Sequence, residues 1–171
     1  MCRRLRLRER GKKGNAMAEL PSPFKENIRR VLTSVNAEGK SYVLADGEPG
    51  DVLILNGCRM VRLWQTDRVP THVPAKADVT APGLGRLPTR FEGTRFYTAE
   101  LPSGVKIPLH KSLSVDYIAV LKGTLTLGLE TGEVALLPGD VVVQTGNMHA
   151  WENRAADPCL IMVCVVGAIE S

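Results

Sequence analysis

Hydrophobic and polar residues alternate with the two-residue period of a β-strand through the second half of the chain. Leu125, Leu127 and Leu129 occupy every second position of one segment, and residues 159–166 form a continuous apolar segment. Turn-forming residues separate the segments at 102–104, 122–123, 131–132, 138–139 and 157–158. Short strands at intervals of roughly 8 to 12 residues are typical of β-sandwiches and β-barrels. We therefore predict an all-β fold from Thr94 onward.

The first half of the chain is less regular. Residues 27–35 and 40–44 predict a hairpin around the Asn-Ala-Glu-Gly turn at 36–39, and residues 60–65 predict a further strand. Four prolines and two glycines predict a long irregular loop over residues 67–90. Long loops in compact domains act as lids or interfaces in some proteins and are plain surface in others. Both interpretations remain open.

A length of 171 residues is enough for one domain with a substantial core. We expect residues 1–18 to be a basic tail that is disordered or not part of the fold. Residues 19–92 are expected to supply N-terminal strands and the Pro/Gly-rich loop, which pack on a barrel formed by residues 93–171. No apolar segment reaches the ~20 residues of a membrane helix, so we expect no membrane partner.

The positive charge of the chain is concentrated at its N-terminus. Residues 1–13 hold seven basic side chains and one acidic one, so this segment carries +6 while the whole chain carries +4, which leaves about −2 for the rest. This distribution argues against a nucleic-acid-binding face on the fold. The tail itself is compatible with an extension that precedes a start at Met17, with an organellar presequence, or with a tether to an anionic partner.

Four cysteines, Cys2, Cys58, Cys159 and Cys164, have no metal-binding or disulfide-framework spacing. Cys159 and Cys164 lie five residues apart in one predicted strand, so their side chains point to opposite faces and cannot pair with each other. We expect reduced thiols and a cytoplasmic, intracellular protein.

Two of the three histidines lie in predicted strands whose geometry can bring reactive side chains together. His110, Ser112 and Asp116 share the parity of one strand face, and Ile118 continues that face toward an apolar interior. In a later segment His149 shares its parity with Trp151. If both faces point into one barrel, the two imidazoles and the Asp116 carboxylate converge at its mouth, with Trp151 as a wall.

Two imidazoles and a carboxylate form the ligand set of a facial metal triad with open positions. The same three groups without a metal can exchange protons, since histidine titrates near neutrality. The sequence leaves both chemistries open. The third histidine, His72, lies in the proline-rich loop, where we expect it to be exposed and without a role in the site.

Residues 93–166 resemble the cupin superfamily, whose two motifs carry histidines between turn glycines. The first motif matches at Gly104, His110, Ser112, Asp116 and Gly123, and the second at Gly139, Gly146, His149 and Asn153. Three positions depart from the family pattern. Ser112 replaces the second histidine of the first motif, Asp116 replaces its glutamate, and Gln144 replaces a proline of the second motif.

The resemblance implies a cupin, or jelly-roll, β-barrel with an additional N-terminal strand region. The chain looks like the small single-domain cupins, some of which resemble fungal cupin-domain oxidoreductases of secondary-metabolite pathways. This similarity implies a small apolar or aromatic, polyketide-like substrate. It also implies a divalent metal, iron, manganese or zinc, held by His110, Asp116 and His149. Cupins commonly pair, and the N-terminal strands are candidates for a homodimer contact.

Our leading hypothesis from the sequence is a metal-dependent oxidoreductase in which His110, Asp116 and His149 are both metal ligands and catalytic residues. Ser112, Ile118 and Trp151 are the expected substrate-binding residues. Two alternatives remain open: a metal-free acid/base enzyme such as a dehydratase, isomerase or decarboxylase, and a non-catalytic protein that binds small molecules.

Overall fold

A computed structural model describes residues 28–80 and 92–169. Within these ranges the chain is all-β and contains twelve strands, which confirms the predicted fold class. They are β1 (Arg30–Val35), β2 (Ser41–Gly47), β3 (Val52–Leu55), β4 (Cys58–Thr66), β5 (Thr94–Leu101), β6 (Lys106–His110), β7 (Ser114–Lys122), β8 (Leu125–Leu129), β9 (Gly132–Leu136), β10 (Val141–Thr145), β11 (His149–Glu152) and β12 (Cys159–Gly167). The predicted basic tail, residues 1–18, lies outside the described residues.

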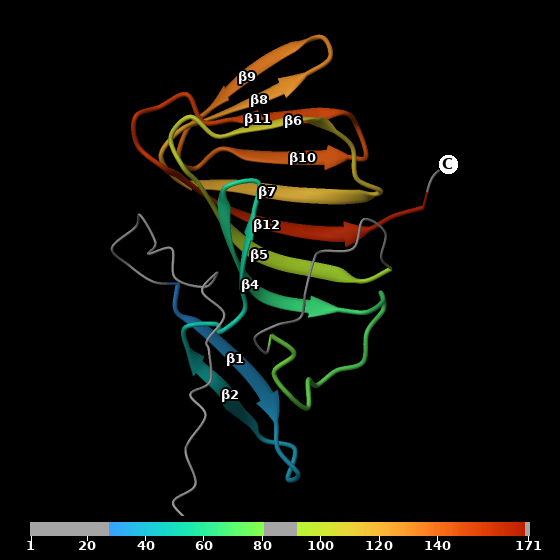
Figure 1. Ribbon diagram of the computed structural model, residues 1–171. Coiled ribbons are helices and arrows are strands. Elements are labelled where there is room, and N and C mark those ends of the chain that lie inside the picture. Colours follow the sequence, from blue (N-terminus) through green and yellow to red (C-terminus); the bar gives the residue numbers. More distant parts are fainter. Residues whose placement is uncertain (1–27, 81–91, 170–171) are drawn as a thin grey trace, which may run out of the picture.

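Two antiparallel sheets build the body of the molecule (Figure 1). The larger sheet has the order β10-β7-β12-β5-β4-β3, and the smaller has the order β6-β11-β8-β9. Non-consecutive strands are neighbours in both sheets, which is the arrangement of a jelly roll. The barrel expected from the sequence is therefore present as two facing sheets, and the described strands do not close into one hydrogen-bonded cylinder.

The core lies between the two sheets because each contributes one apolar face. Ile118 and Val163 come from the larger sheet, and Leu127 and Trp151 come from the smaller one, and all four belong to one buried cluster. The alternation along β7 explains this placement, since Ile118 is 4% exposed whereas its neighbour Tyr117 is 50% exposed on the outer face. The strand period thus decides which side chains reach the interior.

Strands β3 and β4 extend the larger sheet, with β4 paired to β5. The predicted strand at 60–65 lies within β4, but the preceding strand β3 was missed. These two strands form a two-residue hairpin in which Asn56 has a φ of 51° and Gly57 a φ of 78°. An Asn-Gly dipeptide is the preferred sequence of such a turn, so the signal for β3 was available.

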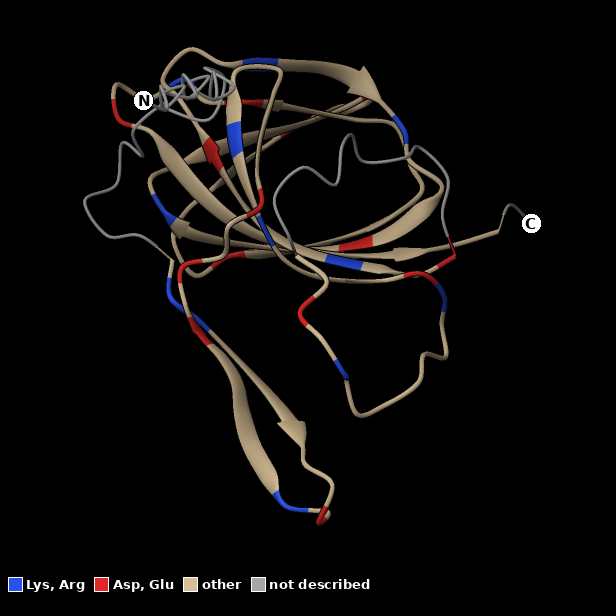
Figure 2. Ribbon diagram, turned by 60° about the horizontal axis from the view of Figure 1, so that its bottom comes forward, with Lys and Arg blue, Asp and Glu red and all other residues tan. Residues whose placement is uncertain are grey.

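The first two strands form a hairpin with its own two-stranded sheet, which extends away from the jelly roll (Figure 2). The backbone amides of Glu38 and Lys40 donate to the Asn36 side-chain oxygen and hold the turn, as predicted around residues 36–39. Residue 27, where the predicted hairpin began, lies outside the described residues. A homodimer contact through these strands stays a prediction.

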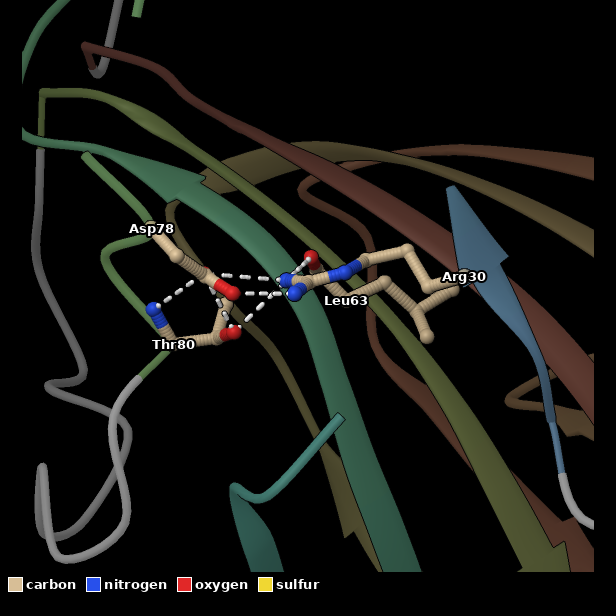
Figure 3. Close-up of polar contacts among 4 residues, drawn as sticks. All are labelled: Arg30, Leu63, Asp78 and Thr80. Carbon is tan, nitrogen blue, oxygen red and sulfur yellow. Dashed lines mark hydrogen bonds and ion pairs between the residues drawn. The ribbon is translucent and has the colours of Figure 1, made fainter. Parts of the chain in front are cut away.

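Arg30 attaches this hairpin to the rest of the fold (Figure 3). Its guanidinium donates to the carbonyl oxygen of Leu63 in β4 at 2.9 Å and to the hydroxyl of Thr80 at 2.6 Å, and it forms an ion pair with Asp78. The hydrogen bonds from Arg30 lower the pKa of Asp78 to about 2. One side chain thus joins β1, β4 and the end of the segment 67–80.

The described part of the long loop, residues 67–80, has no strand of its own, as predicted. The amide of Val69 donates to the carbonyl of Glu92, and the hydroxyl of Ser34 donates to the carbonyl of Ala75. These contacts direct the segment toward the β1–β2 hairpin. Residues 81–91 of the predicted loop lie outside the described residues, so the question of a lid stays open there.

No helix in the described ranges is long and apolar enough to cross a membrane. Cys58, Cys159 and Cys164 are free thiols. Burial raises the pKa of Cys58 and of Cys159 to about 11, so both thiols stay protonated at neutral pH.

Candidate functional site

A cavity of about 300 Å³ lies between the two sheets. Its wall includes all six side chains that the sequence singled out, which are His110, Ser112, Asp116, Ile118, His149 and Trp151. None of the loop residues 67–80 lines it. All six side chains thus meet in one cavity, but the expectation of one shared strand face for His110 and Asp116 was wrong, because the chain turns between them and β6 and β7 belong to different sheets. The roles assigned to these side chains stay predictions.

The two histidines are neighbours because β6 and β11 pair antiparallel with His110 opposite His149. Their ring centroids lie 4.3 Å apart, and the planes are tilted by 54°. Trp151, two residues further along β11, packs edge-on to His149 with a centroid distance of 5.9 Å. The smaller sheet thus presents an imidazole pair with an indole wall.

Backbone carbonyls decide which nitrogen of each imidazole carries the hydrogen. The Nδ1 of His110 lies 2.8 Å from the carbonyl oxygen of Pro108, and the Nδ1 of His149 lies 3.0 Å from that of Asn147. A carbonyl oxygen only accepts, so both Nδ1 atoms donate and both Nε2 atoms keep a lone pair when the rings are neutral. The Nε2 atoms of both rings are therefore available to accept a proton or to bind a metal ion.

His149 is only 3% exposed, and this burial lowers its pKa below the ordinary value of 6.5. The hydrogen bond to Asn147 and the charge of Asp116 act in the opposite direction, while the neighbouring His110 adds to the lowering. The ring is consequently neutral at pH 7, as a proton acceptor or a metal ligand must be.

Asp116 reaches the cavity from the opposite sheet, where serines hold its carboxylate. The hydroxyl of Ser114 donates to Oδ1 at 2.6 Å, and the hydroxyl of Ser112 lies 3.4 Å from Oδ2. The short aspartate side chain therefore bonds to residues at the start of its own strand.

A metal site can be tested against these side chains. The two imidazoles fit a divalent ion, since each offers a free Nε2 and has its Nδ1 anchored by a carbonyl, the usual outer support of a ligating histidine. Asp116 does not complete the set: among the described residues no group of three His, Cys, Asp or Glu side chains is arranged to hold an ion. The predicted triad is thus present as a pair plus a separate carboxylate.

Several cavity residues were not predicted from the sequence. Ser114 and Gln144 lie beside Asp116, and Arg95 and Tyr97 of β5 lie further across the larger sheet. Burial, followed by the charge of Asp116, raises the pKa of Tyr97, so its hydroxyl stays protonated. Ser114 could have been found by extending the parity of Asp116 and Ile118 along β7, whereas β5 could be placed only with the sheet order.

Asn153 and His72 do not belong to the cavity wall. The Asn153 amide is fully buried and donates to the carbonyls of Leu101 and Asp157, while its oxygen accepts from the amide of Ala155. It fixes the turn after β11. His72 is exposed, and its Nε2 lies 3.1 Å from an Arg68 guanidinium nitrogen.

Comparison with known proteins agrees with the jelly-roll fold. No family model matches the chain. It is 26% identical over 144 residues to the cupin-domain-containing oxidoreductase srdD of Neurospora crassa, covering 82% of this chain and 74% of that protein. It is 30% identical over 146 residues to phomopsin biosynthesis cluster protein C' of Diaporthe leptostromiformis, covering 78% and 75%.

The solved structure of the cupin domain of Schizosaccharomyces pombe Cnp3 matches with a TM-score of 0.53 at 11% identity, covering 83% of this chain and 88% of that one. This likeness concerns the fold. The curated fungal relatives show the family: the chain belongs to the cupin superfamily.

Proposed function

We propose that the protein is a cupin-type enzyme that converts a small, largely apolar organic molecule in the cavity between the sheets. The observation that carries this proposal is the pair of adjacent imidazoles, His110 and His149, which have free Nε2 atoms in a cavity with a largely apolar wall. Reactive polar groups in an apolar cavity are the usual form of a small-molecule site. The fungal relatives are named as oxidoreductases and as a biosynthesis-cluster protein, which supports a small metabolite as substrate, and we propose that it is apolar, aromatic or polyketide-like.

Redox chemistry is our first assignment, because several curated relatives are named oxidoreductases. A divalent metal, iron, manganese or zinc, would be held by His110 and His149 and would supply Lewis-acid or redox chemistry. The chain's own contribution is to orient both imidazoles, to keep the buried His149 neutral, and to surround the reacting part of the substrate with Trp151 and Ile118.

Metal-free acid/base chemistry is the second candidate, and the position of Asp116 favours it. Its carboxylate bonds to Ser114 and stands across the cavity from the imidazole pair, as a second proton-transfer group would. Neutral His149 would remove a proton from the substrate at its Nε2. Dehydration, isomerisation and decarboxylation fit this arrangement.

Metal analysis separates these two chemistries. The protein is purified after growth with added iron, manganese and zinc, beside a His110→Ala/His149→Ala double variant and a His72→Ala control. Redox chemistry predicts bound metal in the wild type and the control, and loss of metal in the double variant. Equally low metal in all three proteins would overturn metal dependence.

Turnover tests the enzyme itself. Wild type and double variant are incubated in air with a panel of aromatic alcohols, aldehydes and hydroxyketones, and the products are identified by mass. A change of two hydrogens or one oxygen marks redox chemistry, with dioxygen as oxidant, and loss of water or carbon dioxide marks acid/base chemistry. Binding without any turnover would contradict an enzyme and leave a ligand-binding cupin.

A further inference from the structure

Gln144 is a buried polar residue of the cavity wall that the chemistry above does not use. It lies on β10 directly opposite Asp116 on β7 and is 3% exposed. Opposite residues of an antiparallel pair share one face of the sheet, so the Gln144 amide stands next to the Asp116 carboxylate on the inner face. The cupin second motif, by resemblance, carries proline at this position, so the amide is a feature of this chain.

Neither Oε1 nor Nε2 of Gln144 has a hydrogen-bond partner among the described residues. Buried polar groups in folded proteins are almost always paired, because an unpaired donor or acceptor loses its bonds to water without replacement. An amide offers an acceptor and a donor side by side. The missing partner is therefore expected to offer a donor and an acceptor side by side as well.

The sheet register shows what surrounds this amide. Gln144 and Asp116 form a polar row, and the next inward row, with Ile118 and Val163 on neighbouring strands, is apolar. Asp116 also lies close enough to His149 to influence its charge. A molecule in the cavity thus meets polar groups and imidazoles at one end and, beyond them, a wall that is mainly apolar and includes the Tyr97 side chain.

We propose that Gln144 is a specificity-determining residue that binds a neighbouring carbonyl and hydroxyl at the polar end of the substrate. Its Nε2 donates to the carbonyl oxygen, and its Oε1 accepts from the hydroxyl. The adjacent Asp116 favours a neutral group here over a carboxylate. The inference rests on the proposed function, since it assumes that the substrate occupies the cavity, and it narrows that substrate to an apolar molecule with a hydroxycarbonyl end.

The test compares four aromatic probes of similar size: phenacyl alcohol with both groups, acetophenone with the carbonyl alone, phenethyl alcohol with the hydroxyl alone, and ethylbenzene with neither. Dissociation constants are measured by calorimetry for the wild type, for Gln144→Leu and for Gln65→Leu. Gln65, the other glutamine of the chain, lies in the same sheet on β4 and does not line the cavity, which makes it the matched control.

Phenacyl alcohol should bind the wild type most tightly, and Gln144→Leu should weaken it about tenfold or more while ethylbenzene binds equally well or better. Gln65→Leu should change neither. Thermal unfolding of Gln144→Leu should occur at or above the wild-type temperature, because no intramolecular bond is lost.

Equal binding of phenacyl alcohol and ethylbenzene to the wild type, or equal losses for both in Gln144→Leu, would overturn the role of Gln144 and leave the proposed function standing. Failure of all four probes to bind the wild type would contradict both. Unfolding of Gln144→Leu well below the wild-type temperature would show that the amide has a structural partner and would also refute the inference.

Discussion

Replacing Asn153 by alanine should destabilise the protein strongly without changing the chemistry of the cavity. The side chain is fully buried and makes three hydrogen bonds, to the carbonyls of Leu101 and Asp157 and from the amide of Ala155. Three bonds at about 1 kcal/mol each, with buried groups left unpaired, give a loss of about 3–5 kcal/mol in the free energy of unfolding. For a chain of this size the melting temperature should fall by about 10 °C.

Urea unfolding measures this loss, and Asn147→Ala is the matched control because Asn147 is exposed and lies two residues before His149. The control should unfold within about 0.5 kcal/mol of the wild type. Probe binding by folded Asn153→Ala should match the wild type, since Asn153 does not line the cavity. A stability loss no larger than that of the control would refute this reasoning, and lost binding at full stability would make Asn153 a functional residue.

Three further outcomes are expected. Burial lowers the pKa of His149, so the unfolded chain binds this proton first as the pH falls through about 6.5, and the stability that neutral His149 contributes is present above that pH and lost below it. The urea midpoint of His149→Gln should therefore depend less on pH between 5 and 7 than the wild-type midpoint does. The same pH dependence of the midpoint in both proteins would contradict the lowered pKa. Arg30→Met should make the β1–β2 hairpin susceptible to limited proteolysis, whereas Arg29→Met, which removes an exposed ion pair, should not. Equal resistance of the two variants to the protease would contradict the role of Arg30 in attaching the hairpin. Gly123→Ala would place a Cβ 2.5 Å from a backbone oxygen of Pro158, so it should lower the free energy of unfolding by more than Gly104→Ala, where the glycine has the same φ of 75° and open space around it. Similar losses of unfolding free energy for the two variants in denaturant would exclude the clash.

The strand period made the cavity side chains of the second half predictable. Residues two apart in a strand share a face, which is why Asp116 and Ile118 of β7 both line the cavity, as do His149 and Trp151 of β11. The same local rule could not show that the imidazoles and the carboxylate come from opposite sheets. That separation, which leaves Asp116 bonded to Ser114, depends on the pairing of β6 with β11 and of β7 with β12.

The first half was harder to predict because its residues have roles set by distant partners. Strand β3 is only four residues long, and its best signal is the turn at Asn56 and Gly57 rather than its own pattern. Arg30 lies 48 residues from Asp78 and 50 from Thr80 in the sequence, and the residues next to Arg30 do not predict this contact. Gln144 was noticed only as a departure from a motif, since an unpaired amide is visible only once its surroundings are known.

The central claim is that the His110–His149 pair contacts a small molecule in the cavity, and side-chain nitrogen NMR tests it most directly. Histidine Nε2 resonances are followed while phenacyl alcohol is added to the wild type. The account predicts saturable shifts of the His110 and His149 signals at one common dissociation constant, with the exposed His72 as an unchanged internal reference. Unchanged His110 and His149 signals at saturating probe, or shifts of His72 alone, would contradict it.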